Sequence, residues 1–213
     1  MEFIGQIVDF VLHIDVHLQE IIGQYGALTY LILFLIVFAE TGLVVTPILP
    51  GDSLLFAAGT FAALGSLDPF VLTGLLIVAA VVGDGVNYWI GHWVGPRAFS
   101  GKVRWLREDY LKRTEAFYER HGGKTIIMAR FVPIVRTFAP FVAGVGRMHY
   151  GRFLAFNVVG AVLWVSICVT AGYFFGNLPF VRDNFSLVVL GIIGVSMIPL
   201  FVEWIRHRRA RAA

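Results

Sequence analysis

Cysteine and charge are both scarce in this sequence. Cys168 is the single cysteine among 213 residues, so no disulfide can form within the chain, and we expect its thiol to pack as a small apolar group. Only 15% of the residues are charged, whereas 58% are hydrophobic and the mean hydropathy is +0.78. Soluble domains carry about 25% charged residues. The composition therefore excludes an ordinary soluble protein and predicts an integral membrane protein with one domain, 1–213.

Basic residues are absent from the first 96 positions, and all 17 Lys and Arg residues lie from Arg97 onward. The first twenty residues lack the basic start of a signal peptide, so we expect no cleaved signal there. The basic residues gather in 97–124 and in the tail 206–213. Short loops rich in Lys and Arg stay cytoplasmic, which predicts that both segments are cytoplasmic. Because both flank apolar segments, we do not expect nucleic acid as a partner.

Apolar stretches divide the chain into two similar halves. In each half an amphipathic helix precedes a broken apolar stretch and then an unbroken span, and a last helix closes the chain. The amphipathic helices are expected over 3–22 and 97–124, the broken stretches over 27–64 and 125–146, the spans over 70–94 and 151–176, and the last helix over 185–205.

Prolines interrupt the two broken stretches: Pro47 and Pro50 in the first, Pro133 and Pro140 in the second. The piece that follows Pro50 is too short to span the hydrocarbon core, which needs about 20 residues. If the second stretch crossed the membrane, the basic tail would lie outside, against the positive-inside bias. We therefore predict that both stretches are re-entrant hairpins, the first with its ends outside and the second opening inside.

The predicted fold is an all-α integral membrane protein built as an inverted repeat. Each repeat holds an amphipathic helix, a re-entrant hairpin and a transmembrane helix, with the boundaries 1–94 and 97–177, followed by a C-terminal transmembrane helix at 185–205 and the tail 206–213. Inverted repeats whose broken helices meet near the membrane midplane are a recurring plan of transporters. This order therefore indicates a multi-pass transport protein.

Four charged residues lie within the broken stretches: Glu40 and Asp52 in the first, Arg130 and Arg136 in the second. An Arg at membrane depth costs about 2.5–3.5 kcal/mol on insertion scales, and such residues mark functional sites. An Arg guanidinium binds phosphate oxygens through two parallel hydrogen bonds. One hypothesis is therefore that both Arg side chains clamp a lipid phosphate. The alternative is that they pair with Glu40 and Asp52 and hold the hairpins together.

The geometry of the two arginines and the protonation of the nearby carboxylates both bear on these two hypotheses. Six residues apart on a straight helix, the two Arg side chains would diverge, and Pro133 makes their convergence feasible. Burial disfavours an ionised carboxylate and a nearby Arg favours it, so Glu40 and Asp52 could exchange a proton as the phosphate binds and leaves. Asp84, on a helix face with Asn87, is either a third proton carrier or a packing hydrogen-bond partner.

The span 151–176 carries a face of small and polar residues, which we expect to pack between helices. Asn157 would join two helices by a hydrogen bond. The face comprises Asn157, Gly160, Ala161, Trp164, Cys168 and Gly172. Glycine-rich helix faces would also permit a homodimer.

Four stretches carry a resemblance that extends through nearly the whole chain. They are FAETGLVVTPILPGD, VGDGVNYWIG, GGKTIIMARFVPIVRTFAPFVAGVG and FNVVGAVLW. In them the chain resembles the DedA family of bacterial inner-membrane proteins, which share the VTT domain with eukaryotic lipid scramblases. The resemblance implies transport of undecaprenyl phosphate or another phospholipid across the cytoplasmic membrane, dependent on the proton motive force. It also implies that Glu40, Asp52, Arg130 and Arg136 are essential.

The sequence also permits functional classes other than a lipid flippase or scramblase. A proton- or cation-coupled exchanger of small solutes would use the same carboxylates without a lipid. An enzyme is disfavoured, because no nucleophile stands beside a base and no cluster of metal ligands is present in the sequence; we expect neither metal nor cofactor. A scaffold would tolerate neutral residues at Arg130 and Arg136.

Overall fold

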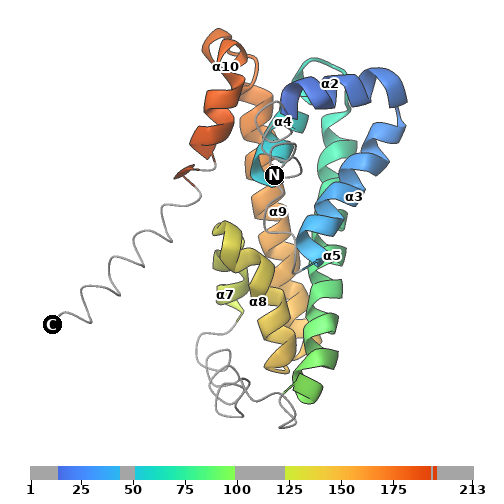
Figure 1. Ribbon diagram of the computed structural model, residues 1–213, viewed down its shortest axis with the longest axis vertical. Helices are drawn as coiled ribbons and strands as arrows, with labels where there is room; N and C mark the ends of the chain where they lie inside the picture. The colour runs from blue at the N-terminus through green and yellow to red at the C-terminus, as the bar shows by residue number, and fades with distance from the viewer. Residues whose placement is uncertain (1–13, 44–50, 99–122, 193, 196–213) are drawn as a thin grey trace, which may run out of the picture. The chain divides into compact units, whose positions relative to one another are not determined.

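Every element of the described chain is a helix (Figure 1). The computed structural model describes residues 14–43, 51–98, 123–192 and 194–195. The helices are α2 (Ile14–Tyr25), α3 (Leu28–Gly42), α4 (Gly51–Ala63), α5 (Pro69–Ala98), α7 (Lys124–Ala129), α8 (Pro133–Val145), α9 (Tyr150–Phe175) and α10 (Pro179–Asp183). Residues 185–192 are also helical. The predicted all-α class is confirmed for this part of the chain.

Two helices are long and apolar enough to cross a membrane: α5 over Pro69–Gly95 and α9 over Tyr150–Phe175. They correspond to the spans predicted at 70–94 and 151–176. The start of α5 is fixed by Asp68, whose Oδ1 accepts from the backbone N–H groups of Phe70 and Val71 at 2.9 Å each. An Asp before a Pro at the first helical position is a strong start signal.

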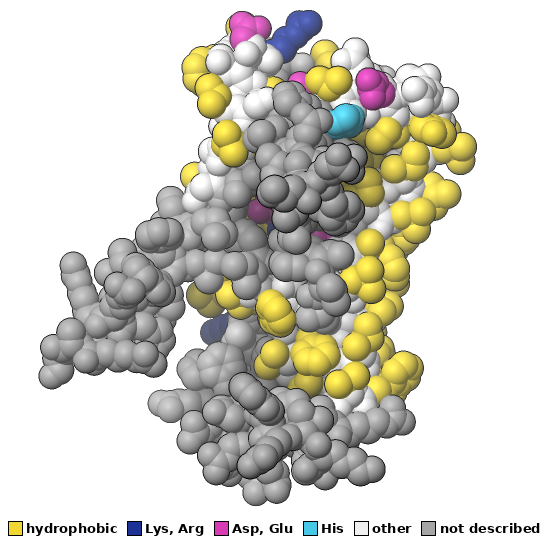
Figure 2. Space-filling view, viewed as in Figure 1, with side chains coloured by type: hydrophobic (Ala, Val, Ile, Leu, Met, Phe, Trp, Pro, Cys, Tyr) yellow, Lys and Arg dark blue, Asp and Glu magenta, His cyan; other side chains and the backbone are white. Residues whose placement is uncertain are grey.

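The surfaces of these helices expose many large apolar side chains. Figure 2 shows hydrophobic side chains along α3 and α5 on the face in view. Exposed on α5 are Val71, Val78, Val82, Val86, Trp89 and Trp93, and on α9 are Val158, Val159, Val162, Leu163 and Ile167. Soluble monomers rarely expose contiguous apolar surface of this kind. The surface is that of a membrane protein whose helices face lipid.

The second broken stretch folds as two helices with a turn at Arg130–Val132. The helix α7 ends at Ala129, Val132 is extended (φ −121°, ψ 106°), and α8 begins with Pro133. Proline suits this first position because its missing N–H would have no helical partner there. Pro140 lies inside α8 and is buried. In the first stretch, α3 and α4 flank residues 44–50, so Pro47 and Pro50 lie outside the described residues.

Several other predictions fall wholly or partly outside the described residues. They are the amphipathic helix at 3–22, of which α2 covers the later part, the amphipathic helix at 97–124, the end of the helix at 185–205, and the tail 206–213.

The chain forms two compact units, each assembled from separate segments. The first unit comprises Met1–Thr29, Leu49–Leu72 and Ser166–Ala213, and the second comprises Tyr30–Ile48 and Thr73–Val165. The units therefore do not coincide with the two predicted repeats, because each contains helices from both halves of the sequence.

In the first unit, glycines bring α4 and the end of α9 into backbone contact. A Cβ added to Gly59 would collide with the carbonyl oxygen of Val169, and one added to Gly172 would collide with that of Phe56. A Cβ on Gly176 would meet the side chain of Thr60. Only glycine permits this approach, so these residues fix where α4 sits along α9.

In the second unit, α8 and α5 meet in the same way. A Cβ on Gly144 would collide with the carbonyl oxygen of Tyr88, and one on Gly91 with that of Phe141. A Cβ on Gly95 would approach Val145 to 3.1 Å. Each contact residue on α8 lies 85 positions after its counterpart on α4. The contact residues at the end of α9, with Gly176 just beyond it, each lie 81 positions after their counterparts on α5. Two helix pairs thus share one contact pattern.

Candidate functional site

Arg130 and Arg136 converge on one aromatic ring in the second unit. Their guanidinium carbons lie 5.6 Å and 4.9 Å from the ring centre of Trp164 on α9. Both are buried, with 3% and 9% of their surfaces exposed. The turn between α7 and α8 interrupts the helix between the two residues, so they do not diverge as they would on a straight helix. Stacking on the indole also favours the cations electrostatically.

Arg130 is held by side chains from two long helices. Its Nη2 forms an ion pair with Asp84 of α5, donates to Oδ1 of Asn157 on α9 at 2.5 Å, and approaches the carbonyl oxygen of Ala80 at 3.5 Å. Its buried Nε makes no hydrogen bond in the part of the chain that is described. Asp84, for which the sequence left two interpretations open, is thus the carboxylate that neutralises Arg130.

Arg136 in the first turns of α8 forms an ion pair with Glu40 of α3. The Glu40 side chain is fully buried. A buried ion is tolerated only when a partner of opposite charge and hydrogen bonds compensate for the lost water. The alternative prediction is that the arginines pair with Glu40 and Asp52 and so hold the hairpins together. The ion pair between Arg136 and Glu40 agrees with it, whereas Arg130 pairs with Asp84.

Two asparagines hold the backbone around these pairs. The Nδ2 of Asn87 on α5 donates to the carbonyl oxygens of Thr41 at 3.1 Å and Thr137 at 2.8 Å, the residues that follow Glu40 and Arg136. Asn157 donates from Nδ2 to the carbonyl oxygen of Val81 at 3.0 Å. The prediction that Asn157 joins two helices is confirmed, and Asn87 joins three: α3, α5 and α8.

Asp52 belongs to the other compact unit. It lies in the first turn of α4 and is half-buried. The structure thus brings together Arg130, Arg136, Glu40 and Asp84, and the role predicted for Asp52 stays a prediction. Among the described residues, no group of three or more His, Cys, Asp or Glu side chains could hold a metal ion.

The site is electrically balanced, because two guanidinium groups face two carboxylates within a buried space. Carboxylate and phosphate oxygens bind the same donors on arginine in the same bidentate geometry. An incoming phosphate could therefore replace either carboxylate. The buried Nε of Arg130, which has no acceptor within the described residues, would give such an anion a hydrogen bond that replaces no existing one.

Trp164 is the site residue whose role the sequence did not predict. We expected it only to pack among small residues, yet its ring contacts both cations. One signal for its role was present: it lies two helical turns after Asn157 on the same face of α9. That Asp84 would be the partner of Arg130 carried no local signal, because the two are 46 residues apart.

Comparison with known proteins gives matches over the whole length of the chain. The profile of the VTT domain matches residues 49–174, which include every charged site residue except Glu40. Protein DedA of Escherichia coli K12 is 57% identical over 215 residues, covering 100% of this chain and 98% of that protein. An uncharacterized membrane protein of Mycobacterium leprae is 43% identical, covering 87% of this chain and 84% of its own. The inner membrane protein YghB of E. coli K12 is 33% identical, with coverage of 83% and 78%. No solved structure matches.

Proposed function

The chain belongs to the DedA family of VTT-domain membrane proteins, and we propose that it moves a phosphorylated lipid across the bacterial cytoplasmic membrane. Undecaprenyl phosphate or a phospholipid is the expected cargo. The observation that supports this most directly is the convergence of Arg130 and Arg136 on Trp164, each paired with a buried carboxylate. Arginine pairs at membrane depth suit an anion whose charge must be neutralised while its hydrocarbon chain stays in lipid.

The charge balance of the site suggests how protons take part. With both carboxylates ionised, the four side chains sum to zero. A singly charged phosphate entering the site would leave one uncompensated negative charge, which is costly in a buried space. Protonation of Glu40 would release Arg136 and restore neutrality, so one proton would accompany each phosphate charge. In this mechanism Asp84 keeps Arg130 ordered, and Asp52 is a second candidate for carrying the proton.

We further propose the inverted repeat as the architecture that carries this site. The matching glycine contacts support it, since the second arm of each predicted hairpin packs on the span of the other repeat: α4 on α9 and α8 on α5. Inverted-repeat transporters place substrate between such broken helices. The basic segments 97–124 and 206–213 favour a cytoplasmic location for both.

The test is translocation of a fluorescent undecaprenyl phosphate analogue in proteoliposomes at two imposed pH gradients. Arg136→Lys keeps the charge but loses the planar fork, and we expect it to slow translocation at least about tenfold. Arg152 on α9 is exposed and supplies the matched control, Arg152→Lys. Equal rates in wild type and Arg136→Lys, with both proteins folded, would return the arginines to a purely structural role.

Proton coupling is tested by Glu40→Gln in the same vesicles. We expect translocation that no longer responds to the pH gradient; a response that persists would discard Glu40 as the proton carrier. The competing function is the proton- or cation-coupled exchange of small solutes. Ion flux through the wild type in vesicles without polyprenyl phosphate, together with no lipid translocation, would favour that function instead.

A further inference from the structure

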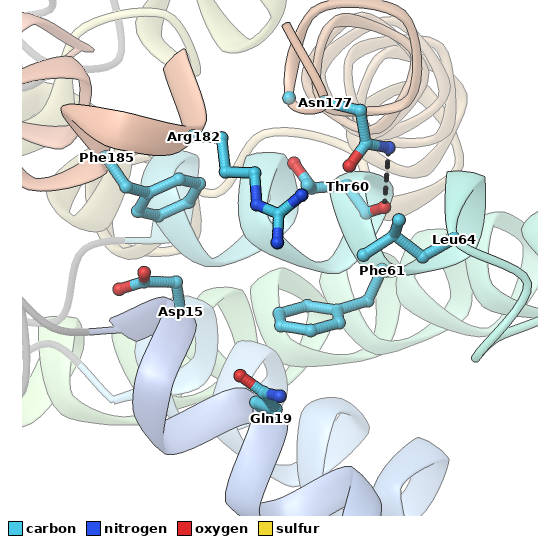
Figure 3. Close-up of a pocket in the computed structure, with 9 residues that line it drawn as sticks. Asp15, Gln19, Thr60, Phe61, Leu64, Asn177, Arg182 and Phe185 are labelled. Carbon is cyan, nitrogen blue, oxygen red and sulfur yellow. Dashed lines mark hydrogen bonds between the residues drawn. The ribbon is translucent and has the colours of Figure 1, made fainter. Parts of the chain in front are cut away.

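A pocket whose wall combines charged and apolar residues lies in the first unit. It has a volume of about 200 Å³ and is bounded by α2, α4, the end of α9, α10 and the helix that follows. Its walls include Asp15 and Gln19 of α2, Phe61 of α4, Arg182 of α10 and Phe185. In Figure 3 the Arg182 side chain extends into the space that Asp15, Gln19 and Phe61 border. The pocket is smaller than the roughly 300–1,000 Å³ typical of drug-sized ligands, so it suits a small polar group.

The two charged residues of the pocket carry opposite signs and stand on different helices. Within the described residues, neither the Asp15 carboxylate nor the Arg182 guanidinium takes part in an ion pair or a side-chain hydrogen bond. Asn177 donates to the carbonyl oxygen of Thr60 at 3.4 Å and so ties the end of α9 to α4. An acid and a base that border one small cavity without joining each other leave room for a ligand with both charges.

The place of the pocket along the chain puts it at the edge of the apolar spans. It is lined by Leu64, five residues before α5 begins, and by Gly176, directly after α9 ends. Large apolar rings on the same unit are exposed nearby in sequence: Phe70 is 86% exposed, Phe180 73% and Phe174 67%. Such rings are stable in contact with lipid and costly in water. The ligand is therefore expected to combine a charged head with a hydrocarbon part.

We propose that this pocket binds the headgroup of a phospholipid with a primary ammonium group, as in phosphatidylethanolamine. Arg182 would bind the phosphate, and Asp15, with the amide oxygen of Gln19, would accept hydrogen bonds from the ammonium. The acyl chains would lie over the exposed phenylalanines. A primary ammonium has three N–H donors and a choline group has none, so the carboxylate selects ethanolamine over choline. This site goes beyond the proposed transport function, because it uses neither arginine of the transport site.

Native mass spectrometry of the full-length protein in detergent tests the proposal. We expect one phosphatidylethanolamine to be retained about tenfold more tightly than phosphatidylcholine or phosphatidylglycerol. Asp15→Asn should abolish the preference for ethanolamine, and Arg182→Gln should weaken every phospholipid at this site. Asp183→Asn and Arg152→Gln, at exposed positions that do not line the pocket, should change neither. Equal retention of the three lipids would overturn the proposal. Losses of lipid binding in the two control variants as large as those in Asp15→Asn and Arg182→Gln would also overturn it.

Two further arms separate the remaining outcomes. Phosphoethanolamine added alone should bind far more weakly than the lipid; equally tight binding would identify a soluble zwitterion as the occupant and overturn the lipid assignment. A second arm uses the wild type, so that unfolding of a variant cannot obscure the result. A phosphatidylethanolamine with a photoreactive headgroup should crosslink to α2 or α10, and crosslinks confined to other segments would refute the site.

Discussion

The ion pair between Arg130 and Asp84 makes a quantitative prediction for a double-mutant cycle. Both side chains are almost fully buried. Arg130→Met would leave the Asp84 carboxylate buried without its cation, which typically costs about 3–5 kcal/mol in free energy of unfolding. Asp84→Leu should cost somewhat less, about 3 kcal/mol, because Arg130 keeps the acceptor on Asn157.

The double variant should be more stable than Arg130→Met alone. Replacing both members of a buried ion pair with apolar residues is often neutral. The remaining cost is the Oδ1 of Asn157, which would lose its donor at about 1–3 kcal/mol. The cycle should therefore give a favourable coupling energy of at least about 2 kcal/mol between Arg130 and Asp84.

The measurement is denaturant unfolding of the purified protein in mixed micelles, for the four members of the cycle. A control cycle combines Asp84→Leu with Arg152→Met, because Arg152 is exposed and forms no ion pair in the described chain. Its effects should add within about 0.5 kcal/mol. A double variant of Arg130 and Asp84 that is less stable than either single variant would refute the pairing.

Three other substitutions have defined outcomes. Gly91→Ala should lower the free energy of unfolding by about 1–3 kcal/mol, because the added Cβ collides with a backbone carbonyl. The control Gly74→Ala, at a position with open space around it, should raise the free energy of unfolding by up to about 1 kcal/mol. Equal effects of the two substitutions in thermal unfolding would contradict the close contact at Gly91. Asn87→Ala should cost about 2 kcal/mol or more, since two backbone carbonyls lose their donor, and an unchanged midpoint would show that these bonds are dispensable. Trp164→Leu should destabilise the protein by about 0.5–2 kcal/mol more than Trp164→Phe, because phenylalanine retains a ring face for the arginines. Equal losses of stability in the two variants, measured by thermal unfolding, would show that the ring does not contribute.

The parts of the fold that the sequence predicted are those fixed by local chemistry. Hydrophobic length alone located α5 and α9, because a span of about 20 apolar residues has few other stable conformations. The interruption of the second stretch followed from Pro133, whose ring and missing N–H restrict it to the start of a helix. These signals depend on neighbouring residues and need no knowledge of tertiary contacts.

Pairings between distant residues could not be predicted in the same way. Either Arg130 or Arg136 could have faced any of three carboxylates, and no local pattern distinguishes Glu40 from Asp84. The choice depends on which helices pack together, and here glycine contacts place α8 against α5. The sequence identified which residues bear the chemistry, whereas the side-chain partners emerged only from the packing.

The glycine contacts also restrict how the helices can move. In the pairs α4–α9 and α5–α8, a backbone carbonyl of one helix fits against a glycine of the other. A slide of less than one helical turn, about 5.4 Å, would bring a side chain to the place where the glycine lies. Gradual shear along these interfaces is therefore sterically blocked. In a conformational cycle each helix pair would move as one rigid body, and bending would be confined to residues outside the glycine contacts.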